Sequence, residues 1–430
     1  MIDEVTIDFG PTTVTGWTDY ELVSDILTPA DGWSVTLPLS GTLEQRQALK
    51  QQIRTDSGGR CFIYIQRNDS TDRAQQLSGV IDDIGAAGAM DGSTLEIRGT
   101  DNGGLLASSS ADPRLGIEAD TSLLDVIRAQ CDPFGISVVA EGLPSRSLLT
   151  GERVAGDRDR LVRRMAREFG LPLRTARRAM IITGSGGGAL TGAEDSDDDF
   201  AVSTPRDRAR DGRAGGLTGR DVEALRVADA KPAPGETRWD FIDRHCRRFG
   251  VMPWIGADGK LVISSPHYDQ EPLFVLTRRI SDGSTNNIVS GGSDESLSQQ
   301  SSEVTVYGRA GGRDATRSRF RGFAQRNASL MPLYRPLVVH DPSIRSQDEA
   351  TRRAKRELAD QNVSSYALEY EVYGHGQGPY LYAVDTVAEV VDEAEAIDGL
   401  FWIASRTFRG SRQNGKTTKL RLLPVGALVL

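Results

Sequence analysis

The chain has 430 residues and a formal net charge of −9, from 51 Lys and Arg against 60 Asp and Glu. This length exceeds one ordinary core, so we expect about three domains. The acidic balance disfavours a dedicated nucleic-acid binder, because such proteins gain affinity from cations that displace counterions from phosphates. Aromatic residues make up only 6% of the chain and glycine occurs 46 times, which favours strands joined by many turns.

Membrane, secretion and metal signals are weak. No stretch approaches the roughly eighteen apolar residues of a membrane span, and the N-terminus MIDEVTIDFG lacks a basic and apolar signal segment. We therefore expect synthesis in the host cytoplasm and no stable membrane insertion. Cys61, Cys131 and Cys246 are odd in number and far apart, so they are interpreted as small buried side chains, with any disulfide left open. His245 and Cys246 are neighbours on a predicted helix and point to different sides, so no zinc site is predicted.

Residues 1–107 are predicted to form a barrel-like β domain. The segments GWSVTLPLS, CFIYIQRND, LSGVIDDIG and STLEIRGTD follow at regular spacing with Gly and Asp turns between them. Several short strands spaced in this way are typical of a barrel or sandwich. Between them, TLEQRQALKQQI is predicted as a short polar helix.

Residues 108–285 contain a repeat of helix-plus-hairpin modules. Segments that begin at Asp120, Asp157 and Gly235 share one layout: a polar cap, apolar residues at helical spacing, Phe-Gly, then a strand. The glycine after each Phe suits a left-handed helix C-cap. In the third copy, MPWIGADGKLVIS is predicted to turn at Asp258-Gly259 into a hairpin.

The third copy also carries an apolar stripe on one helix face. Trp239, Ile242, Cys246 and Phe249 recur at three- and four-residue intervals. A cofactor wall is one interpretation, and core packing is favoured because each helix must bury such a face. A wall-binding protein would instead expose Trp239 and Trp254 as an aromatic shelf, yet both lie in the apolar pattern.

A glycine- and acid-rich insertion is predicted at 184–219. Its low hydrophobicity and mixed charge are typical of a solvated loop. Calcium is the alternative ligand, but the order of ligands and glycine in an EF-hand is absent. The candidate acidic residues are Asp195, Asp197, Asp198 and Asp199.

Residues 286–430 are predicted to form a second barrel-like β domain with one helix over 348–362. SSEVTVYGRA and SSYALEYEVYGHGQ alternate as strands, and SQDEATRRAKRELADQN is amphipathic. The helix carries four clustered cations: Arg352, Arg353, Lys355 and Arg356. Contact with nucleic acid is one interpretation of this cluster, and a solvated face or a subunit contact is favoured.

Gly410–Thr417 spells the phosphate-loop pattern G-x-x-x-x-G-K-T. A nucleotide loop needs a helix after it, whereas Leu420 and Leu422 alternate with cations as in a strand. Asn414-Gly415 is also a strong hairpin-turn dipeptide. We therefore predict a hairpin tip instead of an ATP site.

Five segments together resemble the baseplate hub proteins of contractile-tailed phages, the Mu-like family related to the phage late-control D proteins. They are GRCFIYIQRNDSTDRAQQLSGVIDDIG, GETRWDFIDRHCRRFGVMPWIGADGKLVIS, EVTVYGRA, DEATRRAKRELADQN with LEYEVYGHGQG, and GLFWIASRTFRGSRQNGKTTKLRLLPVGAL. Their order agrees with an α+β, mainly β chain in which two barrel-like domains flank the repeat modules.

The resemblance implies a homotrimeric ring in a virion tail baseplate. Three chains with two similar β modules each would match a sixfold tail tube to a threefold central spike and let DNA pass without specific binding. The implied partners are further copies of the chain, the tube or tube-initiator protein, the spike, the wedge proteins and the tape-measure protein. We expect an acidic lumen, since three copies carry 3 × −9 = −27 formal charges.

The resemblance implies no enzyme, cofactor or metal, and we predict no catalytic, cofactor-binding or metal-ligating residue. The alternative is a tail-associated peptidoglycan hydrolase or a cell-wall-binding protein. A glycosidase needs two carboxylates in a cleft, and no acidic residue stands out from its sequence context.

Overall fold

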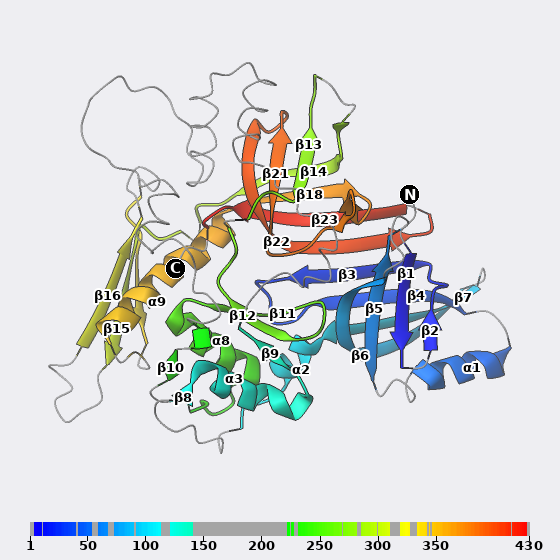
Figure 1. Ribbon diagram of the computed structural model, residues 1–430, viewed down its shortest axis with the longest axis horizontal. Helices are drawn as coiled ribbons and strands as arrows, with labels where there is room; N and C mark the ends of the chain where they lie inside the picture. Colours follow the sequence, from blue (N-terminus) through cyan, green and yellow to red (C-terminus); the bar gives the residue numbers. More distant parts are fainter. Residues whose placement is uncertain are drawn as a thin grey trace.

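The computed structural model describes residues 4–10, 12–39, 42–53, 59–67, 73–89, 92–112, 121–140, 222–223, 225–227, 231–268, 270–281, 285–298, 300–309, 319–326, 333–341, 344, 346–413 and 415–427. The predicted insertion at 184–219, with Asp195, Asp197, Asp198 and Asp199, and the second repeat copy from Asp157 lie outside these residues. The fold is α+β and mainly β, as the sequence predicts (Figure 1).

The N-terminal β region consists of β1 Glu4–Phe9, β2 Thr12–Val14, β3 Asp19–Asp25, β4 Gly32–Leu39, α1 Leu43–Gln51, β5 Arg60–Gln66, β6 Arg73–Ala89 and β7 Gly92–Asp101. The middle region consists of α2 Asn102–Ser108, β8 Thr121–Ser122, α3 Leu123–Cys131, the 3₁₀ turn η2 Asp132–Phe134, β9 Val138–Val139, β10 Arg226–Val227, α8 Arg238–Phe249, β11 Met252–Ile255 and β12 Leu261–Ser264. The C-terminal region consists of β13 Phe274–Arg278, β14 Ile288–Glu295, β15 Glu303–Arg309, β16 Arg319–Gln325, β17 Pro336–His340, α9 Gln347–Ser365, β18 Tyr366–Tyr373, β19 Gly376–Gln377, β20 Tyr380–Leu381, β21 Thr386–Asp392, β22 Ile397–Ser411 and β23 Gly415–Pro424.

One sheet of thirteen described strands joins the two β regions. Its main order is β14-β18-β23-β22-β3-β4-β7-β6-β5-β1-β2, with β13 and β21 branching from β22. The connection is the antiparallel pair β22–β3, in register from Ser405↔Asp25 to Ser411↔Asp19. Among the described residues the sheets are open and none closes into a barrel, which differs from the barrel-like expectation. The reason is that β3 pairs with β4 along one edge and with β22 along the other. The N-terminal strands therefore continue into the C-terminal strands instead of closing on themselves.

Alternation along the strands puts the largest core on one side of this sheet, and a smaller core with Trp402, Ala404 and Leu423 covers part of the other side. β4 and β5 follow the inside–outside pattern along their length, as expected for strands with one buried face. Leu22 and Trp33 from the N-terminal region share this core with Phe408 and Leu420 from the C-terminal region. The two β regions are therefore joined by backbone pairing and by shared apolar burial.

The middle region packs its helices against a small sheet, β11-β12-β9. Ser122 caps α3 by accepting from Asp125 N–H, and Thr237 caps α8 by accepting from Asp240 N–H. Gly135 and Gly250 have φ of 68° and 75°, the left-handed conformation predicted at both Phe-Gly sites. The helix-plus-hairpin layout is thus confirmed for the third copy, and for the first copy up to the short strand β9.

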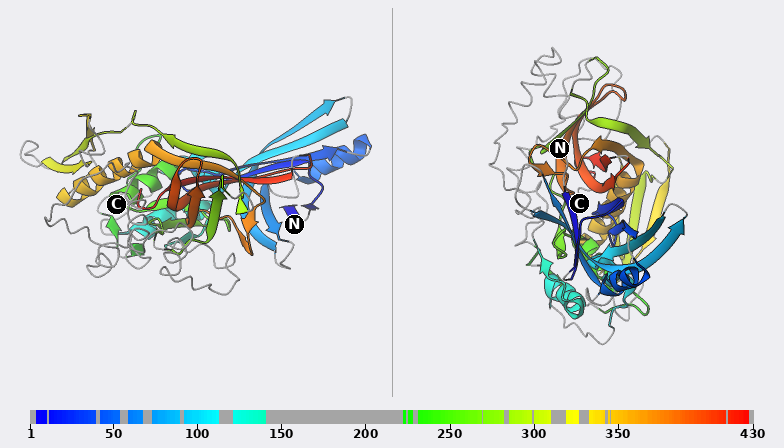
Figure 2. Two further views of the ribbon diagram at one scale, coloured as in Figure 1. Left: turned by 90° about the horizontal axis from the view of Figure 1, so that it is seen from above. Right: turned by 90° about the vertical axis from the view of Figure 1, so that its right-hand side faces the viewer.

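A separate three-stranded sheet, β16-β15-β17, lies beside α9 (Figures 1 and 2). Val304 and Val306 of β15 face Ala350 and Ala354 of the helix in one small core. Ser346 caps α9 by accepting from Glu349 N–H. The helix predicted over 348–362 is therefore present, and it covers one face of this sheet.

The phosphate-loop pattern is the turn of the hairpin β22–β23, as predicted. Ser411 pairs with Gly415, and β23 continues as a strand where a nucleotide loop requires a helix. Gly415 takes the positive φ of 80° that the turn requires. Asn414 lies outside the described residues.

Gly410, in the same motif, is where the hairpin meets β3. A Cβ at this position would lie 2.2 Å from Cε1 of Tyr20. Tyr20 is buried, and its Oη is 2.5 Å from Nε2 of His375, so the ring has little room to move. We predict that Gly410→Ala lowers the free energy of unfolding by about 1–3 kcal/mol, measured by thermal or urea unfolding.

Gly32→Ala is the matched control, because nothing lies within 4 Å of a Cβ built there. Its stability should stay within about 0.5 kcal/mol of the native chain. Equal effects of the two substitutions would contradict the close packing assigned to Gly410.

Candidate assembly surfaces

Beyond the smaller core around Trp402, the face of the large sheet opposite the largest core is polar and crosses both β regions. By the strand registers, Glu369, Lys419, Arg409, Glu21 and Arg98 all lie on this face. Unlike charges alternate along it: Lys419 Nζ lies 2.6 Å from Glu369, Arg409 Nε 3.4 Å from Glu21 and Arg98 Nη2 2.7 Å from Glu96. These three cations are locally neutralised, so they do not form a stripe for phosphate.

Two buried carboxyls lie where this sheet meets α2. Asp31 Oδ1 accepts from Asp25 N–H at 2.7 Å, and Asp101 Oδ1 caps α2 by accepting from Gly103 N–H at 2.8 Å. Burial raises the pKa of Asp31 well above its usual range, and the charge of Asp101 adds to this. Burial likewise raises the pKa of Asp101 to about 7.

Arg406 of β22 is the buried cation of the same area. Its guanidinium lies 4.0 Å from the ring centroid of Phe408, and its Nε and Nη1 have no hydrogen-bond partner among the residues that the structure describes. Burial lowers the pKa of Arg406 to about 10, and the nearby Asp31 charge opposes that shift. Arg406 therefore remains a cation at neutral pH and attracts Asp31.

An ion pair between the partly exposed Arg278 and the buried Asp392 fixes the end of the sheet at β14. Arg278 binds Asp392 through two hydrogen bonds, Nε–Oδ1 at 2.8 Å and Nη2–Oδ2 at 2.6 Å, and Tyr370 donates to Asp392 Oδ2 at 2.7 Å. Arg278 Nη1 also donates to the carbonyl of Gly291 in β14 at 2.9 Å. Burial opposes ionisation of Asp392, but the hydrogen bonds from Arg278 and Tyr370 hold its pKa below the usual value. The contacts of Arg278 in β13 and Asp392 in β21 thereby link these two strands to β18 and β14.

Most of the clustered cations of α9 bind groups within the chain, so they do not form a free surface for nucleic acid. Arg356 is only 4% exposed and binds Asp360 at 2.7 Å, while Arg353 pairs with Glu357 at 3.0 Å. Arg352 donates to the carbonyl of Arg248 in α8. The sequence interpretation of a solvated run is therefore wrong for Arg356, because α9 turns that position toward α8, whereas Lys355 is exposed.

The other residues singled out from the sequence lie in cores. Trp239 and Trp254 are each 6% exposed, so they form no exposed shelf. Cys61, Cys131 and Cys246 are buried free thiols, and burial raises the pKa of each. His245 is fully buried beside Phe241, and burial lowers its pKa to about 3.

Within the described ranges, no group of three or more His, Cys, Asp or Glu side chains is arranged to hold a metal ion. Among the helices described, none combines the length and the apolar character needed to cross a membrane. The features that sequence reasoning missed are the buried charges, because runs such as VVDEAEAID carry no local signal that Asp392 is buried.

We predict that Asp392→Asn lowers the free energy of unfolding by about 3 kcal/mol, because it removes the buried carboxylate that binds Arg278 through two hydrogen bonds and leaves only the more exposed Glu395 nearby. In the native chain this stabilisation is present above the unfolded pKa of about 4 and is lost as pH falls through the lower folded pKa. Glu395→Gln is the control, since Glu395 is 3.7 Å from Arg278 and 38% exposed, and it should cost less than about 1 kcal/mol. Equal costs at neutral pH would contradict the role given to Asp392.

Asp101 has the opposite pH dependence. Its folded pKa of about 7 lies above the unfolded value of about 4, so its contribution to stability is complete below pH 4 and falls as pH rises toward 7. Asp101→Asn keeps an acceptor for Gly103 N–H and removes this dependence. We expect the variant to gain about 1–4 kcal/mol relative to the native chain between pH 4 and pH 8.

The measurement is urea unfolding at a series of pH values. Asp19→Asn, which changes an exposed carboxyl of the same sheet, is the control. Its curve of unfolding free energy against pH should run parallel to the curve of the native chain. An Asp101→Asn curve that also runs parallel would show that Asp101 is not protonated in the fold.

Two segments of the chain match models of tail-protein domains. Residues 301–358 match "Tail protein NMB1110-like, third domain", and residues 360–424 match "Tail protein, C-terminal domain". No curated protein matches the sequence.

Solved structures extend the likeness to the whole chain. The tail protein from Neisseria meningitidis MC58 is similar with a TM-score of 0.66 and 20% identity, covering 100% of this chain and 98% of that chain. The 43 kDa tail protein of prophage MuSo2 from Shewanella oneidensis has a TM-score of 0.63 and 16% identity, covering 99% of each. The chain therefore has the fold of these tail proteins over its whole length, and its C-terminal segments match tail-protein domains.

Proposed function

We propose that the chain is a structural baseplate hub of a contractile phage tail. Three copies form a ring that adapts a sixfold tail tube to a threefold central spike and lets DNA pass. The observation that carries the proposal is the joining of two β regions in one open sheet through β22 and β3, within a fold similar to tail proteins from end to end.

A resemblance between the two β regions supports a ring of six modules. Each region contains a long antiparallel hairpin, β6–β7 in the first and β22–β23 in the second. Each also has a helix before one of its sheet strands, α1 before β5 and α9 before β18. In this proposal, 1–107 and 286–430 supply the two modules and 108–285 lies between them.

The charges of the sheet suit a surface past which DNA slides. Lys419, Arg409 and Arg98 on the polar face are each paired with a carboxylate, and the net charge of −9 per chain repels phosphate. The proposed lumen is therefore acidic or neutral, and a basic lumen would contradict this part of the proposal.

The proposed partners follow from the place of a hub in a tail. They are further copies of the chain, the tail tube or tube-initiator protein, the central spike, the wedge proteins and the tape-measure protein, all in the virion baseplate. The alternatives, a peptidoglycan hydrolase and a wall-binding protein, have no supporting observation in the described residues, where Trp239 and Trp254 are buried.

Electron microscopy of tails labelled with an antibody fragment against this chain tests the proposal. We expect three labels around the central axis at the baseplate end of the tube. Labels along the sheath, on fibres or at the head-proximal end would overturn the hub role.

A further inference from the structure

We propose that neighbouring copies of this chain join edge to edge, with β14 of one copy paired antiparallel to the end of β6, residues 87–89, in the next copy. The inference rests on the proposed ring and names the strands that close it. The two β regions repeat one pattern of strands, and only one of the two junctions that this pattern implies is made within a chain.

The two β regions contain four corresponding strands in the same order. In the large sheet, the run β14-β18-β23-β22 is followed directly by the run β3-β4-β7-β6. All neighbours within both runs are antiparallel, and both runs end in a long hairpin, β22–β23 and β6–β7. β14 therefore corresponds to β3, and β6 corresponds to β22.

A bulge at the same place in both hairpins fixes the correspondence residue by residue. The register of β6 against β7 shifts at Asp82, and the register of β22 against β23 shifts at Ala404. Beyond the bulge, both strands pair without interruption up to the turn of the hairpin. Counted from the bulge, Ala87 of β6 has the same place as Arg409 of β22.

Within the chain, β3 covers the part of β22 that lies beyond the bulge. Residues 405–411 pair antiparallel with Asp19–Asp25, and Arg409 lies opposite Glu21. Before the bulge, β22 pairs with β21 and β6 pairs with β5. In the part of the chain that the structure describes, no strand takes the corresponding place of β3 beside residues 87–89 of β6.

Residues 87–89 lie beyond the reach of a longer β5. The carbonyl of Gly59, directly before β5, accepts from Ile81 N–H at 2.8 Å. In antiparallel pairing, a strand continued over the five residues before Gly59 would end opposite Ala86. Ile53, which precedes those five residues, lies in a helical turn just after α1 and packs in the largest core.

β14 is the strand that corresponds to β3, and it ends the large sheet. Among the described residues it pairs only with β18. Two rows of paired residues that start just beyond the bulges cross the two runs of strands in the same way. They are Asp83–Arg98–Ser34–Glu21 and Ser405–Arg421–Glu369–Gly292. Gly292 thus has the place of Glu21, and its partner in the repeated junction is Ala87.

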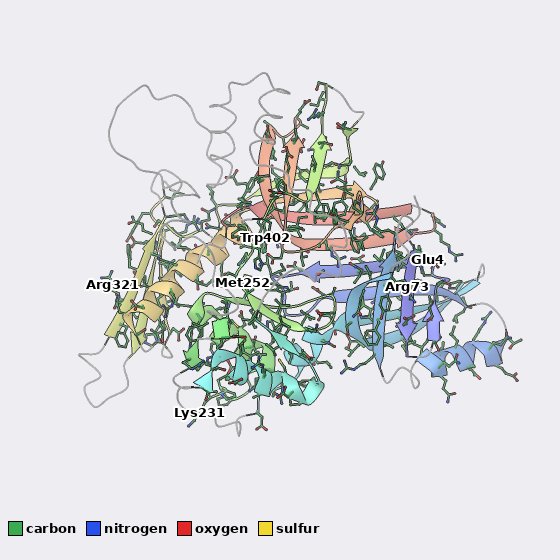
Figure 3. All side chains as sticks on the ribbon, viewed as in Figure 1. Glu4, Arg73, Lys231, Met252, Arg321 and Trp402 are labelled. Atoms are coloured by element: carbon green, nitrogen blue, oxygen red, sulfur yellow. The ribbon has the colours of Figure 1, made fainter. Side chains whose placement is uncertain are left out.

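The β6 that meets β14 belongs to another copy. Six strands lie between β14 and β6 in the sheet of one chain. In the view of Figures 1 and 3, β14 lies above β18, whereas β6, with Arg73 at its start, lies to the right. Because the two edges differ, the contact is heterologous, and such a contact generates a ring when the rotation closes.

The backbone at this junction is oriented for pairing. Arg412 N–H donates to the carbonyl of Thr18, so alternation also turns the N–H and C=O of Gly410 toward β3. Gly88 has the place of Gly410 and therefore turns its N–H and C=O away from β7, where Gly291 of the next copy lies opposite. The carbonyl of Gly291 already accepts one hydrogen bond, from a side chain of β13, and its second lone pair remains for Gly88 N–H.

The glycine at position 88 has no cause within its own fold. A Cβ at Gly88 would make only an ordinary contact, 3.6 Å from Oγ of Ser93. Ala87 beside it is small and exposed. Glycine in a strand often marks a place where another backbone approaches closely, which is what pairing with β14 of the next copy requires.

Disulfide trapping tests the contact and its register in the full-length chain. Ala87→Cys is mixed with Gly292→Cys at high protein concentration under mild oxidation. Since the native cysteines are buried, we expect a covalent dimer from the mixture and none from either variant alone. Glu295→Cys replaces Gly292→Cys in the negative control, because three residues along β14 the side chain points to the other face. This control should give at least tenfold less dimer.

The matched positive control lies within one chain. Glu21 and Arg409 are paired at the corresponding position of the junction between β3 and β22. A chain with Glu21→Cys and Arg409→Cys should therefore form an intramolecular disulfide under the same oxidation.

A chain with both Ala87→Cys and Gly292→Cys measures the closure of the ring. We expect a covalent trimer as its largest product, because each copy then joins the next on both sides. A ladder of products that continues past the trimer would overturn closure at three copies.

Gly88→Pro provides a readout that does not depend on sulfur geometry. The substitution removes the N–H that faces the next copy and costs no hydrogen bond to β7, so the melting temperature should stay close to that of the native chain. We expect at least a tenfold loss of the trapped dimer when Gly88→Pro is added to Ala87→Cys. An unchanged yield would overturn the backbone pairing.

The outcomes separate this contact from the hub role. If the mixture gives no dimer while the control pair in one chain is oxidised, the contact is wrong. A dimer from one variant alone would indicate a symmetric contact and would also overturn it. Labelled tails with three copies at the axis would then leave the hub role standing, with the ring closed through other surfaces. A covalent trimer together with labels elsewhere on the tail would keep the contact and overturn the hub role.

Discussion

The pairing of β22 with β3 is the interaction on which the rest of the structure depends. It joins segments near the two ends of the chain over seven residue pairs and makes one sheet from two β regions. Closing so long a loop carries an entropic cost that grows slowly with length, and the shared core of Leu22, Trp33, Phe408 and Leu420 offsets it. Because the pairing sets which face is buried, it also creates a polar face that runs across both regions.

Charged side chains lie at the places where elements meet. The buried Asp392 holds Arg278 at the β14 end, the buried Arg406 lies near Asp31 beside the β22–β3 pair, and the partly exposed Arg247 bridges Asp243 of α8 and Asp360 of α9. Buried ion pairs add less stability than apolar packing of the same volume. Their placement at junctions is consistent with a role in setting the geometry of the modules relative to one another.

Local patterns predicted local structure well. Strand alternation, the Phe-Gly helix ends, the α9 helix and the hairpin at Gly415 all follow from residues within a few positions of each other. Gly410–Thr417 matches the phosphate-loop pattern completely. A hairpin was predicted there nevertheless, because the residues after Lys416 alternate as in a strand. These features need only short-range physics, so one sequence is enough to find them.

The long-range features were not predictable in the same way. Nothing near Asp25 or Ser405 in the sequence indicates that they pair, and two separate barrels fit the alternation equally well. The burial of Arg356 was missed because α8, which covers it, lies far away in sequence.

The central claim is that both β regions form one permanent sheet that serves as the building unit of an assembly. Hydrogen exchange of the intact chain measures this most directly at β3 and β22. The account predicts that their amides exchange as slowly as those of β4 and β7, and far more slowly than those of β2 and β14 at the ends of the sheet. Exchange in β3 and β22 as fast as at those ends would show that the two regions separate in solution, which would contradict the account.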